Sequence, residues 1–125
     1  MPQIVNEASG VAISSALSAT LVDLTSTGDT TLYIVPAGKN LVVTSVILFN
    51  PSSSLTAFSW SIGYNVTHDD VIGGQLTSGL TLGDYAKFQP TSPAIIGIPD
   101  ELLKIAVGST HSGVTVTVQV LGYLV

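Results

Sequence analysis

Hydrophobic and polar residues alternate with a period of two along much of the chain, a pattern typical of β-strands that bury one face. The alternation is clearest near the end of the sequence, where four valines share one face: Val114, Val116, Val118 and Val120. Residues 56–64 alternate in the same way, with four large apolar side chains on one face: Phe58, Trp60, Ile62 and Tyr64. We expect both segments to be strands that direct these side chains into a core.

One stretch, Leu41–Phe49, is apolar at nearly every position and is interrupted only by Thr44 and Ser45. Such a run predicts a central strand packed on both sides. It follows the apolar run Leu32–Val35 and the break Pro36-Ala37-Gly38-Lys39-Asn40. Because Pro fixes φ and Gly permits positive φ, this break is typical of a tight reversal. We expect two paired or successive core strands joined by that turn.

Four more segments are bounded by Gly, Pro, Asp or Ser and have strand composition. They are Thr20–Leu24, Thr81–Phe88, Ala94–Ile98 and Leu102–Val107. No segment carries a convincing apolar period of 3.6, although a short helical turn within residues 67–76 stays open. The pair Gly73-Gly74 indicates loop backbone, and we expect the long passage 65–79 to cross between two sheets. The pattern predicts an all-β, single-domain β-sandwich, specifically a jelly roll of seven to eight strands.

The beginning of the chain differs from the rest, because its apolar and polar residues are mixed and include Gly10 and the pair Ser14-Ser15. We expect residues 1–15 to be an N-terminal arm or a loosely attached strand, and residues 16–125 to form the sandwich domain. Residues 1–7 lack the basic and continuous apolar regions of a signal peptide, so we expect synthesis and use without export.

Composition changes the picture, because only 9% of the 125 residues are charged and 46% are hydrophobic, with a net charge of −5. The mean hydropathy is +0.57, and polarity comes mainly from 15 Ser and 14 Thr. Charge of both signs normally keeps a small domain soluble, so we expect partners to cover part of the exterior. The chain has no arginine and three scattered lysines, which argues against binding to nucleic acid. Its apolar runs are far shorter than the ~20 residues of a membrane-spanning helix, so we expect no membrane partner.

The candidate chemistry is confined to His68-Asp69-Asp70, where an imidazole beside two carboxylates suggests a metal ligand set or a proton relay. Adjacent residues project in different directions, so a metal would need distant help, for example from Asp84 or His111. The pattern favours a polar loop in which Asp caps a turn. The chain has no cysteine, which removes thiolate sites.

Other possible sites have plainer interpretations. We expect His111 to lie at a hairpin tip, and Asp100 and Glu101 to be solvated charges at a turn. The sequence contains neither a Gly-x-Ser-x-Gly elbow nor a phosphate-binding loop. The aromatic set Phe58, Trp60 and Tyr64 would suit a carbohydrate platform, but its shared strand face favours burial. We therefore predict no enzyme, no catalytic residue, no metal and no cofactor.

The segment Thr31–Val46, followed by Asn50, resembles a pattern of small virion proteins of tailed bacteriophages. In those chains a "YxVPAGK" turn is followed by an apolar strand that ends near an Asn. The resemblance extends to residues 93–98 and 102–107 and to the terminal Val/Thr strand, about two-thirds of the chain in all.

This resemblance implies a jelly-roll virion component, most similar to a head decoration (cement) protein. Such a protein assembles as a homotrimer on the capsid exterior, binds the major capsid protein and carries no catalytic residue or cofactor. It is made in the host cytoplasm and is then part of the virion. The alternative is a tail- or fibre-associated β-sandwich that recognises host glycans. The partner contacts that we expect are Ile4, Val5, Val11 and Ile13 of the arm and Lys39 at the turn.

Overall fold

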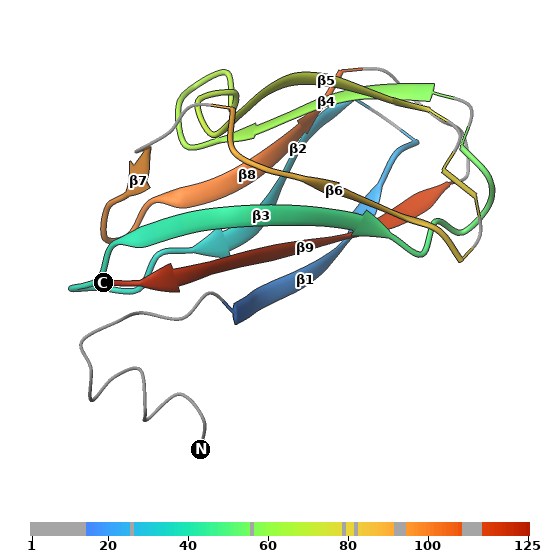
Figure 1. Cartoon of the computed structure of the whole chain (residues 1–125). Helices are drawn as coiled ribbons and strands as arrows, with labels where there is room; N and C mark the ends of the chain where they lie inside the picture. The colour runs from blue at the N-terminus through green and yellow to red at the C-terminus, as the bar shows by residue number, and fades with distance from the viewer. Residues whose placement is uncertain are drawn as a thin grey trace.

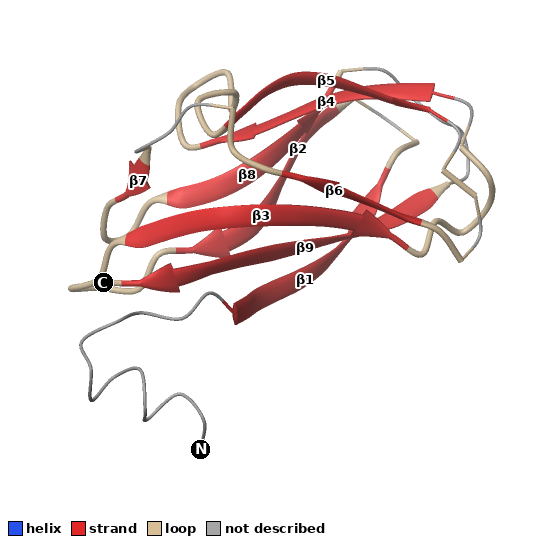
Figure 2. Ribbon diagram, in the orientation of Figure 1, coloured by secondary structure: helices blue, strands red, loops and turns tan. Residues whose placement is uncertain are grey.

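The computed structural model describes residues 15–25, 27–55, 57–78, 80–81, 83–91, 95–108 and 114–125. Over these residues the chain forms nine strands and no helix (Figure 1, Figure 2). The strands lie in two layers packed face to face, with one sheet above the other in Figure 1. The all-β sandwich that the sequence predicts is confirmed.

Strands from distant parts of the chain alternate within each sheet. The first sheet has the order β1 (Ser15–Asp23), β9 (Thr115–Leu124), β3 (Leu41–Phe49) and β6 (Tyr85–Phe88), and β7 (Ile96–Gly97) pairs with the start of β3. The second has the order β2 (Gly28–Ile34), β8 (Leu102–Val107), β4 (Ala57–Gly63) and β5 (Ile72–Ser78). All neighbours are antiparallel. With the two-residue β7 set aside, this is the strand order of a jelly roll.

The core lies between the sheets and consists of the faces that the alternation predicts. Val114, Val116, Val118 and Val120 are all at most 2% exposed, and Phe58 and Ile62 are fully buried. Trp60 packs edge-on against Phe88, with ring centroids 4.8 Å apart, and its Nε1 donates a hydrogen bond to Thr77 Oγ1 at 2.8 Å. The hydrogen bond to Thr77 offsets the cost of removing the indole N–H from water, so the large ring can be buried.

Strand β3 is central in its sheet, and its near-continuous apolar run has a structural cause. The register with β9 shifts between Val43 and Ser45, so that the inward face changes phase and both Ser45 and Val46 are buried. The opposite positions, including Ile47 and Phe49, are only half-buried. The expectation of packing on both sides is therefore wrong within one subunit, because the outer face of β3 is not covered.

The turn 36–40 connects β2 in one sheet to β3 in the other, so the two strands are successive and not paired. The Lys39 N–H donates to the Pro36 carbonyl at 3.2 Å, and Gly38 has φ of 74°. A four-residue turn with positive φ at its third position favours glycine there. The turn also pairs with the residue after β9, because Asn40 and Val125 exchange backbone hydrogen bonds of 2.8 and 2.9 Å.

The passage 65–79 differs from its interpretation in the sequence. Residues Ile72–Ser78 form β5, which pairs with β4 in the same sheet, so neither a helical turn nor a crossing between sheets occurs here. The crossing follows β5, on the way to β6. An edge strand needs only one buried face, and Ile72 and Thr77 provide it while Gly74 points outward. With β5 included, the described residues form nine strands, one more than the seven to eight expected.

Candidate functional site

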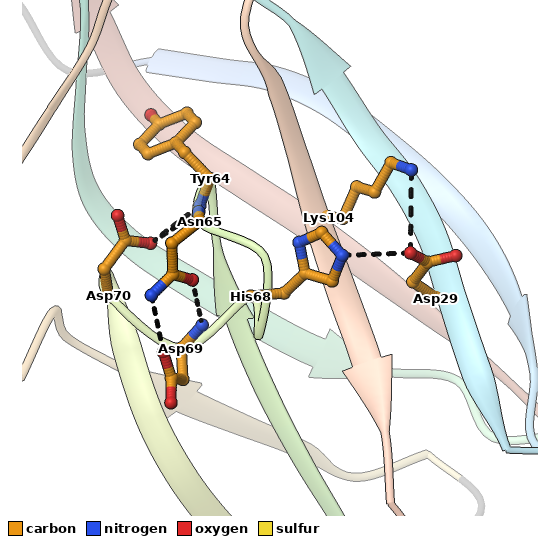
Figure 3. A network of polar contacts seen from close by, with 7 residues as sticks. All are labelled: Asp29, Tyr64, Asn65, His68, Asp69, Asp70 and Lys104. Carbon is orange, nitrogen blue, oxygen red and sulfur yellow. Dashed lines mark hydrogen bonds and ion pairs between the residues drawn. The ribbon is translucent and has the colours of Figure 1, made fainter.

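The loop between β4 and β5 is closed by a reciprocal pair of polar side chains (Figure 3). Asn65 Nδ2 donates to Asp69 Oδ1 at 2.8 Å, and the Asp69 N–H donates to Asn65 Oδ1 at 2.9 Å. Thr67 Oγ1 donates to the same Asp69 oxygen at 2.7 Å. These hydrogen bonds favour the ionised carboxylate and hold the pKa of Asp69 below its usual value, with Asn65 making the largest contribution.

Asp70 satisfies backbone donors where β4 ends. Its Oδ1 accepts hydrogen bonds from the Tyr64 N–H at 2.7 Å and from the Asn65 N–H at 3.4 Å. Gly63 permits this arrangement, since a Cβ there would overlap Asp70 Oδ1 and lie 2.7 Å from two backbone nitrogens. This is the capped polar loop that the sequence predicts for His68-Asp69-Asp70.

His68 ties the loop across the outside of the second sheet. Its Nε2 lies 2.9 Å from Asp29 Oδ2 on β2, and Lys104 Nζ on β8 lies 3.6 Å from the same oxygen (Figure 3). The positive charge of Lys104 is the main cause of a lowered pKa at Asp29, and the hydrogen bond with His68 acts in the same direction. The pairs are partly exposed to solvent, so each one contributes little to stability.

Acidification tests this network. The pKa values of Asp29 and Asp69 are lowered in the fold, so the stability that they provide is present above their unfolded value and is lost as the pH falls through the folded one. We expect the temperature of unfolding to fall as the pH is lowered past the usual pKa of aspartate, and to fall less in an Asp29→Asn variant. Calorimetry at stepped pH measures both. An equal pH dependence in the two proteins would contradict a role for Asp29.

The arrangement does not gather a metal site. In the part of the chain that the structure describes, no three His, Cys, Asp or Glu side chains converge on one point. Asp84, the suggested helper, lies in the connection before β6, where it accepts a hydrogen bond from Thr81 Oγ1 at 2.7 Å. His111 lies outside the described residues. The observed contacts of His68, Asp69 and Asp70 position a loop.

The aromatic platform is absent from the surface of β4. Phe58 is fully buried and Trp60 is 2% exposed, so the shared face of this strand is core, as the alternation favours. Tyr64 is half-buried, and its ring lies where a Cβ on Gly97 would be, with the nearest atoms at 2.6 Å. Burial is the main cause of a strongly raised pKa at Tyr64, and the negative charges of Glu101 and Asp70 add to it.

The other predicted positions lie at turns or outside the described residues. Asp100 is exposed with φ of 70°, and Glu101 Oε1 accepts a hydrogen bond from the Ile98 N–H at 2.9 Å, so both belong to a turn. Lys39 is exposed in the connection between β2 and β3. The expected arm contacts lie outside the described residues: Ile4, Val5, Val11 and Ile13.

The sequence does not predict the outer face of the first sheet. On this face the registers of four strands align side chains in rows. The first row is Leu21, Thr117, Phe49 and Tyr85. The second row is Ala19, Gln119, Ile47 and Lys87. Their sequence neighbours Val22, Val116 and Leu48 are fully buried, so both rows point away from the core. We call these eight residues the outer face.

Of the eight outer-face residues five are apolar and one, Lys87, is charged, and a groove lies beside them. Leu21 is 65% exposed and Tyr85 is 70% exposed. The groove has a volume of about 540 Å³ and lies beside β3 and β6, between Phe49, Tyr85 and Gln119, with Asp84 at its rim. The apolar residues at alternate positions of Leu41–Phe49 are the sequence feature that indicates this face, although the sequence pattern assigns them to packing within the subunit. The fold and this face together define a jelly-roll β-sandwich with a candidate protein-binding surface.

The chain matches no protein-family model, and no curated protein is similar to it in sequence. The solved structures that the chain resembles include two from phage capsids. One is described as "Acidic stable capsid structure of Helicobacter pylori bacteriophage KHP30", with 16% identity and a TM-score of 0.49 over 90% of this chain and 91% of that chain. The other is "Cyanophage Pam1 capsid asymmetric unit", with 13% identity and a TM-score of 0.47 over 90% and 85%. The described residues also include no helix long and apolar enough to cross a membrane.

Proposed function

We propose that this protein is a structural component of a tailed-phage virion, a decoration subunit that binds the outside of the head and stabilises the shell. The observation that carries the proposal is the outer face, which presents Leu21, Phe49 and Tyr85 with a single charge, Lys87. Exposed apolar side chains grouped on one face are typical of a site of protein association. The resemblance of residues 31–50 to small virion proteins supports a phage virion as the assembly that the protein joins.

The engagement of the polar residues supports a structural role over a catalytic one. Asp69 and Asp70 accept hydrogen bonds from the loop that contains them, and Asp29 is shared by His68 and Lys104. Each of these contacts holds one carboxylate oxygen against the loop or against the neighbouring strands, which is the arrangement of a structural network. We propose that the network keeps the β4–β5 loop rigid on the outer side of the second sheet.

Assembly into a closed ring fits the exposed edges of the two sheets. Strands β1 and β6 are edges of the first sheet, and β2 and β5 are edges of the second. Exposed edges promote uncontrolled pairing, which symmetric assembly limits by covering them. We propose a homotrimer that contacts the major capsid protein, with Lys39 as one contact. Repetition over a shell makes individually weak contacts strong.

The burial of Trp60 removes the main support for the glycan-binding alternative, because sugars stack on exposed rings. A tail or fibre protein with another ligand would have to recognise it through a surface other than the aromatic residues of β4. The decoration role therefore stands as our proposal without a second candidate.

Light scattering after size-exclusion chromatography, followed by sedimentation with empty capsids, tests the proposal. We expect a stable oligomer that sediments with capsids, and weaker sedimentation by a Tyr85→Lys variant, which places a charge beside the groove. The matched control is Leu76→Lys, since Leu76 is 73% exposed on the second sheet. A stable monomer without affinity for capsids would contradict the proposal. Equal losses in both variants would show that the outer face makes no specific contribution to assembly on the capsid.

A further inference from the structure

We propose that the outer face binds the N-terminal segment, residues 1–14, of a neighbouring copy of this chain. The segment would place Val5 in the groove beside Phe49 and Tyr85, and Glu7 against Lys87. This inference rests on the proposed function in one respect only, that copies of the chain assemble.

The chemistry of the segment complements that of the face. Lys87 is the one charged residue among the eight of the outer face. Glu7 is the one charged side chain in the segment, and apolar residues lie on both sides of it, Ile4 and Val5 before and Val11 and Ile13 after. A largely apolar surface with one cation, Lys87, therefore meets an apolar segment with one anion. Asp84 also lines the groove, and its negative charge favours an apolar side chain there and Glu7 beside Lys87. A pair at the rim fixes register and orientation more than it adds affinity.

The spacing of the residues also agrees. Tyr85 and Lys87 are two apart on β6, so they point to the same side of the strand. This side faces away from the core, because Phe88, the next residue, points inward and contacts Trp60. Val5 and Glu7 are likewise two apart. In an extended chain, residues two apart lie on one side at about 6.6 Å, so both contacts form together if the segment lies along β6.

The point where the segment joins the fold favours a neighbouring copy as its source. Ser15 begins β1 and lies opposite Gly122, whereas Leu21, in the row of the groove, lies opposite Thr117. Strand β1 thus runs from Ser15 toward the groove end of the sheet, and the chain before Ser15 joins at the opposite end. A segment of the same copy would have to reverse at once to reach the groove, while one from a neighbour enters without reversal. Fully extended, 14 residues span up to about 46 Å, which is enough to reach another subunit.

Such a contact joins two different surfaces, the segment of one copy and the outer face of the next. A head-to-tail contact of this kind closes into a ring when its rotation allows. It would cover β3 on its outer side, the position that the apolar run Leu41–Phe49 predicts to be packed.

A disulfide trap tests the proposal on the purified protein, and the absence of cysteine from the chain makes the trap clean. Glu7→Cys and Lys87→Cys variants are made separately, one of them isotopically labelled, mixed and oxidised. We expect a covalent pair whose linked peptide joins positions 7 and 87 and disappears on reduction. The matched control replaces Lys87→Cys by Thr31→Cys, an exposed position on the outer side of the second sheet.

Three results would overturn the proposal. They are no 7–87 linkage, equal linkage to position 31, and, in a Glu7→Cys/Lys87→Cys double variant, linkage within single chains only. Charge reversal gives an independent readout: Glu7→Lys and Lys87→Glu should each weaken self-association up to about fivefold, and their combination should restore it. No restoration would overturn the Glu7–Lys87 contact. Because these measurements contain no capsid, they can fail while capsid binding stands, and the reverse also holds.

Discussion

Replacing Gly122 by alanine is expected to lower the free energy of unfolding by about 3 kcal/mol, among the largest effects of any single methyl group in this fold. Gly122 lies on β9 opposite Val43, next to the point where the register of β3 shifts. A Cβ at Gly122 would overlap the carbonyl oxygen of Val42 and lie 3.2 Å from the Val43 Cα. These are backbone atoms of a central strand, so they cannot move aside as the end of a flexible side chain would.

Urea denaturation measures this effect, and Gly74 provides the matched control. Gly74 lies on the edge strand β5, and a Cβ there would meet no atom within 4 Å. Gly74→Ala should leave the midpoint of unfolding unchanged or raise it slightly, since alanine restricts the unfolded chain. Similar midpoints for the two variants would show that the close approach at Gly122 does not constrain the fold.

Replacing Trp60 by alanine is expected to cost about 4 kcal/mol of stability. The indole is 2% exposed, packs edge-on against Phe88 and donates a hydrogen bond to Thr77 Oγ1. Truncation therefore leaves a cavity between the sheets and removes the hydrogen-bond partner of a buried hydroxyl. Thermal or urea unfolding, followed by circular dichroism because the variant lacks the tryptophan signal, measures the loss.

Tyr85→Ala is the control for an aromatic residue at the surface. Tyr85 is 70% exposed, so its removal should change stability by no more than about 0.5 kcal/mol. The same substitution should weaken self-association, because the ring borders the groove. If Tyr85→Ala destabilised the isolated subunit as strongly as Trp60→Ala, the outer face would be part of the fold and not a surface for a partner.

Strands with a strong local pattern could be predicted from the sequence to the residue. Leu41–Phe49 and Leu102–Val107 have the predicted bounds, because each is an apolar run bordered by turn-forming residues. Strand β5 was missed because Gly73 and Gly74 lack the β-branched side chains that mark a strand. Its backbone is nevertheless held by the ladder to β4, an interaction that composition does not reveal.

The site divides in the same way between local and distant interactions. The turn-capping role of Asp70 was predictable, because its partners Tyr64 and Asn65 are five or six residues away. The contact between His68 and Asp29 spans 39 residues and depends on which strand lies beside which. The outer face needs the registers of four strands at once, from Leu21 to Tyr85. Periodicity identifies which residues share a face of one strand but not which strands are neighbours.

The pairing of β1 with β9 also governs the time course of folding. Strand β9 lies between β1 and β3, so the first sheet has no continuous ladder until the last strand of the described fold is in place. Before then β3 exposes one edge of its backbone. Ordering the chain between such distant partners costs entropy before the contacts form, so we expect refolding over milliseconds to seconds. During synthesis, completion of the sheet should wait for the final strand to leave the ribosome.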